Sequence, residues 1–180
     1  MDTLGNFIES YDKKQCKKET LLTKYIKNNA HPNILYIVKL GGGSKLGSFC
    51  EQFSFHKFNI LTKRLKNNTG YDAIIQINNI NINIEIKTST LHKSNDFMWQ
   101  HIAIKHLWNI LLLIGIHYNK ILFFGMTRKI FEKLVTDEKI TNQGNKNKNS
   151  EQGMWFKYSN VINDLKLIET NEDLLHLCSH

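Results

Sequence analysis

The sequence predicts one α/β (α+β) domain in which helices lie on both sides of a small central β-sheet. Three observations lead to this fold class. Apolar residues recur every three or four positions in the first 30 residues, polar and apolar residues alternate from Gly70 to Thr88, and two short apolar runs follow at Ile110–Ile116 and Ile121–Met126. The length of 180 residues suits a single compact domain with a real hydrophobic core.

Helices are expected at four places along the chain. The N-terminal helical pattern should end at Asn28–Pro32, because proline disfavours helix in the residue before it. Gly41–Ser44 is the clearest break, and Ser44 is the expected N-cap of a second helix. Thr127 should cap a third helix, and the last helix is expected near Asn171–Leu177.

The alternating segment predicts a β-hairpin. Tyr71–Ile77 and Ile80–Lys87 should pair across a two-residue turn at Asn78-Asn79, because asparagine tolerates positive φ. In that register Asp72 faces Glu85. One face of the hairpin then collects isoleucines and forms a core face, whereas the two carboxylates lie opposite each other on the other face.

Two facing carboxylates destabilise a sheet unless something compensates their charge. A divalent cation is the natural compensation for Asp72 and Glu85, because hard cations bind carboxylate oxygens. Lys87 lies two residues along the same strand, where its ammonium group can contact both water and a phosphate. Such a site suits hydrolysis of a phosphodiester.

A purely structural interpretation is also open. An acidic-x-Lys triplet arises easily in a lysine-rich chain, and Asp12–Lys14, Asp137–Lys139 and Asp164–Lys166 match it too. By the triplet alone, Glu85 and Lys87 would be the solvated face of an amphipathic strand. Only the Glu85 copy ends a strongly alternating strand with an aspartate predicted to face it.

Gly70-Tyr71-Asp72, followed after twelve residues by Glu85–Ser89, resembles the core motif of the PD-(D/E)xK nuclease superfamily. Within it, the chain is most similar to small type II restriction endonucleases. The resemblance covers roughly residues 44–135 and includes an upstream helix, the motif hairpin, a helical or looped segment and two further strands. Tyr71 stands where the family usually has proline. The implied fold is a restriction-endonuclease-like mixed sheet flanked by helices.

The resemblance also implies roles for individual residues. Asp72 and Glu85 would bind Mg²⁺, the carbonyl of Ile86 would complete the ligand set, and Lys87 would orient or deprotonate the attacking water. Many relatives add an acidic residue from the helix before the hairpin. Glu51 is the best match, and its alternative interpretation is an exposed helix residue.

The segment after the hairpin approaches DNA in the resembling family. Gln100, His101 and Lys105 are therefore candidate phosphate or base contacts, with ordinary surface positions as the alternative. The large apolar side chains of the same segment are expected in the core, namely Phe97, Trp99, Ile102 and Trp108.

Composition limits the partners and the compartment. Twenty-four Lys and Arg against sixteen Asp and Glu give a net charge of +8, which favours an anionic partner. The three cysteines show no CxxC spacing, so neither a disulfide framework nor a zinc knuckle is expected. The N-terminus lacks a signal-peptide pattern, and Ile110–Ile116, the longest apolar run, is too short to cross a bilayer. We therefore expect a cytoplasmic protein that is not secreted and has no membrane partner.

The expected function is that of a Mg²⁺-dependent endonuclease that cuts double-stranded DNA, most simply a type II restriction enzyme leaving 5′-phosphate and 3′-hydroxyl ends. A homodimer is expected, because two identical sites must address two antiparallel strands. The alternatives are a repair or junction-resolving nuclease of the same fold and a basic DNA-binding module without catalysis. Residues 1–43 form a helical region suited to dimerisation, 44–135 the catalytic core, 141–152 a mobile loop and 153–180 a C-terminal segment.

Overall fold

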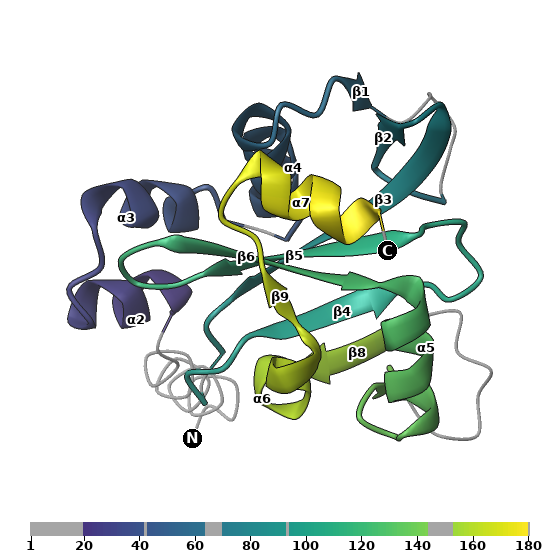
Figure 1. The fold of residues 1–180 in the computed structure, drawn as a ribbon. Coiled ribbons are helices and arrows are strands. Elements are labelled where there is room, and N and C mark those ends of the chain that lie inside the picture. Colours follow the sequence, from purple (N-terminus) through teal and green to yellow (C-terminus); the bar gives the residue numbers. More distant parts are fainter. Residues whose placement is uncertain (1–19, 42, 64–69, 93, 144–152, 180) are drawn as a thin grey trace, which may run out of the picture.

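A mixed β-sheet runs through the middle of the molecule (Figure 1). The structure is a computed structural model that describes residues 20–41, 43–63, 70–92, 94–143 and 153–179, with main chain only at residues 62 and 63. The strand order is β1-β2-β3-β5-β6-β9; β3 and β5 run parallel and the other neighbours antiparallel. The strands are β1 (Thr62–Lys63), β2 (Ala73–Ile77), β3 (Ile80–Thr90), β5 (Ile110–Ile116), β6 (Ile121–Thr127) and β9 (Lys166–Leu167).

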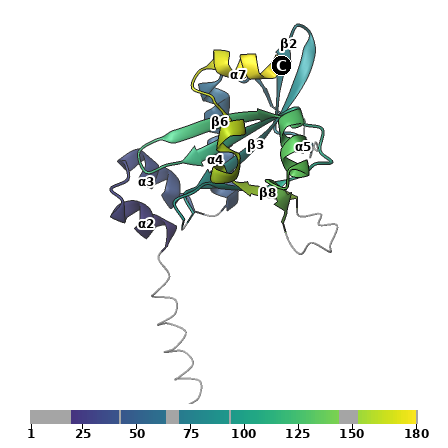
Figure 2. The same cartoon turned by 60° about the horizontal axis from the view of Figure 1, so that its bottom comes forward.

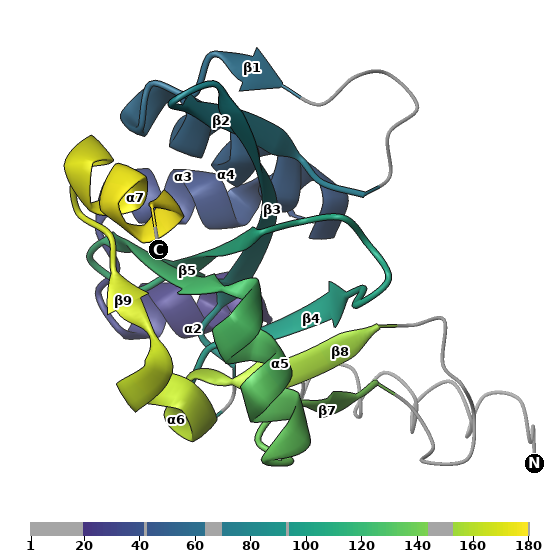
Figure 3. The same ribbon diagram turned by 45° about the vertical axis from the view of Figure 1, so that its right-hand side comes forward.

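A second, antiparallel sheet in the order β4-β8-β7 lies on one side of the central sheet. Its strands are β4 (Met98–Ile102), β8 (Met154–Lys157) and β7 (Thr141–Asn142). Figures 1 and 3 show α4 and α7 on the opposite side, so the central sheet is covered on both faces. The predicted mixed α/β architecture is thereby confirmed.

Helices pack around these two sheets. They are α2 (Leu21–Lys27), α3 (Pro32–Lys39), α4 (Gly43–Lys57), α5 (Arg128–Thr136), α6 (Tyr158–Val161), followed by the 3₁₀ turn η1 (Ile162–Asp164), and α7 (Asn171–Cys178). Figures 1 and 2 show α2 and α3 at one end of the molecule and the β2–β3 hairpin at the other. In the described parts of the chain, none of these helices combines the length and apolar character needed to span a bilayer.

The predicted hairpin and its register are confirmed. Ile77 pairs with Ile80 and Ala73 with Ile84, as the alternation requires. Asn78 and Asn79 have φ angles of 50° and 65°, the two positive values that a type I′ turn needs. The turn chemistry and the pattern of apolar residues therefore select the same pairing.

The second strand pair and the core also match the prediction. β5 and β6 form an antiparallel pair from Ile116↔Ile121 to Ile110↔Thr127. All seven residues of β5 are buried, because the sheet is covered on both faces. The four large apolar residues predicted in the core are at most 4 % exposed: Phe97, Trp99, Ile102 and Trp108.

The helix predictions hold with one correction. α2 ends before the predicted Asn28–Pro32 break, and Pro32 then begins α3, where its missing N–H is harmless. Thr127 caps α5, with its hydroxyl accepting a hydrogen bond from the N–H of Ile130 at 3.4 Å. Ser44 is not an N-cap, because α4 already begins at Gly43. Gly41, at φ 61°, turns the chain early enough for this earlier start.

Two segments differ from the expected loops. The predicted helical or looped segment after the hairpin contains a strand, β4, because its apolar side chains reach the core while its main chain pairs with β8. Thr141 and Asn142, predicted as part of a mobile loop, form β7. The rest of that loop (144–152) and the first half of the N-terminal helical pattern (1–19) lie outside the described residues.

Candidate active site

Asp72 stands immediately before β2 and is tied to β3 by its main chain and its side chain. Its N–H donates to the carbonyl of Ile84 at 2.8 Å, and its Oδ2 accepts from the N–H of Ile86 at 2.8 Å. The paired register ends at Ala73↔Ile84, and Asp72, one residue beyond it, bonds to the two residues that flank Glu85 on β3. The carboxylate is therefore oriented before any ligand arrives.

Glu85 lies on β3 and is only 4 % exposed. Its Oε1 accepts a hydrogen bond from the ammonium group of Lys87, with which it forms an ion pair. Burial raises the pKa of Glu85, Lys87 opposes that rise, the negative charge of Asp72 adds to it, and His106 opposes it. The negative charges of Asp72 and Glu85 thus repel each other in a poorly solvated place.

A cleft of about 890 Å³, here called the main cleft, opens where β2 begins, beside the second half of β3. α4 forms one wall and β4 contributes to the other. The α4 wall consists largely of small residues, including Gly43 and Gly47, which leave room for a ligand. The predicted site residues that line the main cleft are Glu51, Asp72, Ile86, Lys87, Gln100 and His101.

Two predicted residues do not line the main cleft. Glu85 is packed beside the main cleft, and it reaches the site through its ion pair with Lys87. Lys105 is exposed on the segment after β4 and is not among the residues that line the main cleft. Its position gives no support to a direct role beside Asp72.

The donor atoms around Asp72 suit a hard divalent cation. Ile86 directs its N–H toward Asp72, and a strand residue directs its N–H and C=O to the same edge, so the Ile86 carbonyl faces that edge too. Two carboxylates and a carbonyl are all oxygen donors, which Mg²⁺ prefers while retaining waters. Among the described residues, no three His, Cys, Asp or Glu side chains gather to hold a metal.

A β-bulge aims Gln100 and His101 into the main cleft. Trp99 pairs with Phe156 but Ile102 pairs with Met154, so β4 has one residue more than β8 between these pairs. His101 adopts a φ of 59°, a value that residues with a side chain rarely take. Bulges of this kind redirect side chains beside functional sites.

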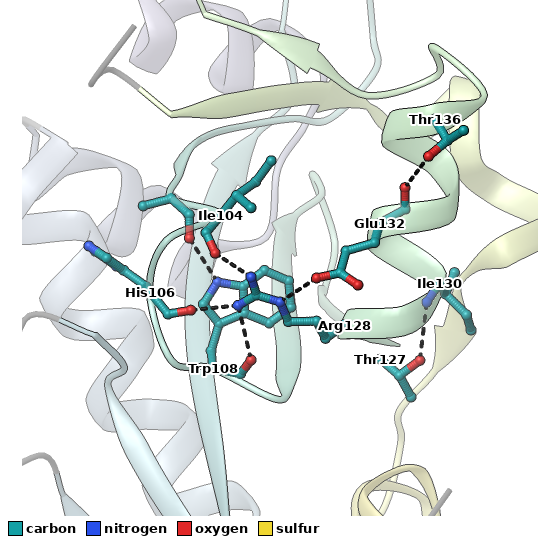
Figure 4. A network of polar contacts seen from close by, with 9 residues as sticks. Ile104, His106, Trp108, Thr127, Arg128, Ile130, Glu132 and Thr136 are labelled. Carbon is teal, nitrogen blue, oxygen red and sulfur yellow. Dashed lines mark hydrogen bonds and ion pairs between the residues drawn. The ribbon is translucent and has the colours of Figure 1, made fainter. Parts of the chain in front are cut away.

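Two side chains, Gln143 and Arg128, hold the segments around the site. Gln143 accepts a hydrogen bond from the N–H of His101 at 3.2 Å and donates one to Oε1 of Gln100 at 3.0 Å. Arg128 lies 4.8 Å from the ring centroid of Trp108 and donates to the carbonyls of Ile104 and His106 (Figure 4).

Arg128 thereby anchors the segment that carries His106 toward Glu85. Asn83, two residues before Glu85 on β3, holds the same segment from the other side, because its side chain donates to the carbonyl of Leu107 at 2.7 Å. Sequence reasoning found neither Arg128 nor Gln143. Both act across more than 20 residues of chain, and no local pattern signals such contacts.

Comparisons with family models, curated proteins and solved structures found no significant match to this chain.

Proposed function

We propose that this chain is a Mg²⁺-dependent endonuclease of double-stranded DNA, of the type II restriction kind, with a PD-(D/E)xK core. One observation carries the proposal. Asp72 just before β2, Lys87 on β3 and Glu51 on α4 all line the main cleft. Glu85 is ion-paired to Lys87 within the same site. Chance acidic-x-Lys triplets elsewhere in the chain would not be expected to have these partners.

Asp72, Glu85 and the carbonyl of Ile86 would hold Mg²⁺, whereas Glu51 lines the same cleft without joining them in a three-carboxylate cluster. When bound, Mg²⁺ supplies positive charge to the scissile phosphate and lowers the pKa of water. Lys87 is 23 % exposed at its side chain and already oriented by Glu85, so its ammonium group can donate to the attacking water or to a phosphate oxygen. Asp72, fixed by the N–H of Ile86, needs no rearrangement to take part.

Double-stranded DNA is the proposed substrate, because the net charge of +8 favours a polyanion and the main cleft opens to solvent beside β4. Cleavage of both strands by one kind of site requires two copies, so the proposed active form is a homodimer. The mixed sheet, with the hairpin next to the parallel pair β3–β5, supports the restriction-endonuclease-like core.

The proposal is tested by incubating supercoiled plasmid with Mg²⁺ or with EDTA. Wild type should linearise the plasmid only with Mg²⁺, and Asp72→Ala and Lys87→Ala should each abolish cleavage. Asp164→Ala is the matched control, because Asp164 belongs to another acidic-x-Lys triplet, forms an ion pair with Lys139 at 3.4 Å and does not line the main cleft. Equal cleavage by all four proteins, or none by wild type, would refute the proposal.

The products separate the related functions. Discrete fragments from a sequenced plasmid support a restriction enzyme, whereas structure-dependent nicking indicates a repair or junction-resolving nuclease. Salt-sensitive DNA binding that is indifferent to Mg²⁺ and to Asp72→Asn, without cleavage, indicates a binding module.

A further inference from the structure

We infer that Gln100 reads DNA bases at the cut site through its amide N–H groups, and that Gln143 sets which end of that amide faces the DNA. This inference rests on the proposed function and adds the specificity-determining residues to it. It follows from three features of the described residues: the position of Gln100 between two hollows, the bulge that aims it, and the hydrogen bonds that orient it.

Gln100 lies where two hollows meet. It lines the main cleft together with Asp72 and Lys87, and it also lines a second hollow of about 850 Å³ with Asn142 and Gln143. A duplex whose phosphate lies beside Asp72 would therefore extend its neighbouring bases past Gln100. Amide side chains are suited to such contacts, because they can satisfy donors and acceptors on base edges.

The main chain around Gln100 is shaped for this orientation. The bulge in β4 places Gln100 and His101 together at the cleft, with His101 at φ 59°. Gly153 lies against this bulge so closely that a Cβ there would be 3.0 Å from main-chain atoms of His101 and Ile102. Strained main chain persists where the surrounding structure holds it, and it concentrates at functional sites.

The hydrogen bonds fix the direction of both amides. Oε1 of Gln143 accepts from the N–H of His101, so its Nε2 is the group that faces Gln100. That Nε2 donates to Oε1 of Gln100 at 3.0 Å. The Gln100 amide therefore uses its oxygen within the protein and presents its N–H groups to the cleft.

This direction predicts the bases that are recognised. N–H donors favour bases whose major-groove edge carries acceptors and no amino group, which are guanine with O6 and N7 and thymine with O4, whereas adenine carries its acceptor N7 beside an amino group. Gln143 is a positioning residue in this scheme, because it acts through Gln100. Changing Gln143 should thus alter the preferred bases and not only the rate.

The test is to sequence all fragment ends from a plasmid of known sequence digested with Mg²⁺ and to derive the base preference at each position around the cut. Gln100→Ala should lower the preference for guanine or thymine by about tenfold at one or two positions, as expected for the loss of a base contact. Gln52→Ala is the control, because Gln52 is exposed on α4 outside the main cleft and should leave the preferences unchanged.

Gln143→Glu is the sharper variant. One carboxylate oxygen of the variant still accepts from the N–H of His101. The other oxygen faces Gln100 and can only accept, so the Gln100 amide would turn its N–H groups toward it and present its Oε1 to the cleft. The preference at the same positions should then move toward adenine and cytosine, whose edges carry amino groups. Gln100→Glu should cause the same move without altering Gln143, so the inference stays testable if thermal melting shows that one variant does not fold.

Other results of this experiment would overturn the inference. A uniform loss of cleavage at all sites in Gln100→Ala would show a phosphate contact and overturn the inference. Cleavage by wild type without any base preference, or an unchanged preference in both glutamate variants, would overturn it while leaving the nuclease function intact. Absence of cleavage by wild type would refute the proposed function and this inference together.

Discussion

The carboxylate of Asp72 accepts a hydrogen bond from the main-chain N–H of Ile86 at 2.8 Å. A side chain thus continues the pairing of β2 with β3 beyond the last paired residues of the strands. The same contact holds the carboxylate at the main cleft, so Asp72 has a structural role and a proposed chemical role that different substitutions can separate.

Asp72→Asn should separate these two roles. Asparagine keeps an oxygen that can accept from Ile86, so the free energy of unfolding should change by less than about 1 kcal/mol. Cleavage should fall by more than about 100-fold, because loss of a ligand costs at least as much as loss of the groups that orient it. Urea unfolding and plasmid cleavage measure the two effects, and unchanged cleavage would contradict the metal-binding role. Asp72→Ala removes the hydrogen bond as well and should cost about 1–3 kcal/mol.

Glu85→Gln should change how stability depends on pH. Burial raises the pKa of Glu85 above its ordinary value of 4.5, so the folded protein keeps this proton when the unfolded chain has lost it. The contribution of Glu85 to the free energy of unfolding is therefore greatest below pH 4.5. It is lost as the pH rises through the pKa that Glu85 has in the folded protein. Glutamine does not titrate, so the variant does not lose stability in this way. The stability of Glu85→Gln relative to wild type should therefore increase from acidic to neutral pH.

Urea unfolding at several pH values measures that difference. Glu172→Gln, an exposed carboxylate on α7, is the control. A stability difference between Glu85→Gln and wild type that stays constant with pH would show that Glu85 titrates alike in both states.

Mg²⁺ should stabilise the wild-type protein against heat. A cation bound by the folded state alone adds about 2.7 kcal/mol at a concentration 100 times its dissociation constant. The increase in Tm should disappear in EDTA and should be much smaller in Asp72→Asn and Glu85→Gln. Equal increases in wild type and both variants would assign the effect to other parts of the surface.

Gly115→Ala should destabilise the core. A Cβ at Gly115 would lie 2.8 Å from two atoms of the Phe97 ring, and a buried ring cannot move without disturbing its neighbours. We expect a loss of about 1–3 kcal/mol in thermal or urea unfolding. Gly47→Ala is the opposite case, because a Cβ there meets nothing within 4 Å and alanine favours helix. It should gain about 0.5–1 kcal/mol. A loss in Gly47→Ala as large as in Gly115→Ala would contradict this account.

Arg128→Lys should loosen the segment between β4 and β5. The guanidinium group donates to the carbonyls of Ile104 and His106 and binds Glu132 at 2.8 Å. A lysine ammonium group lacks this planar set of donors and cannot make all three contacts. The expected loss is about 1–3 kcal/mol. Hydrogen exchange should increase mainly between residues 103 and 109, whereas an increase spread over the whole chain would indicate global destabilisation instead.

Local signals were sufficient for much of the fold and for the centre of the site. The Asn78-Asn79 turn and the alternating isoleucines specify one hairpin register, because a shift by one residue would expose the apolar face. That register predicts that Asp72 lies beside Glu85, and in the structure Asp72 is bonded to Ile84 and Ile86, the residues on either side of Glu85. The pair β5–β6 and the cap at Thr127 follow equally from neighbouring residues.

Tertiary structure decided the rest. α4 packs against β3 and brings Glu51 to the main cleft, although 20 residues separate it from Asp72 in the chain. β4 pairs with β8, more than 50 residues later, and the resulting bulge aims Gln100 and His101. The spacing of apolar residues and the residues of a turn determine structure between neighbours in the sequence. The packing of distant elements depends instead on shape and burial across the whole core. The sequence by itself therefore determined the carboxylate pair, and only the folded chain determined which side chains surround it.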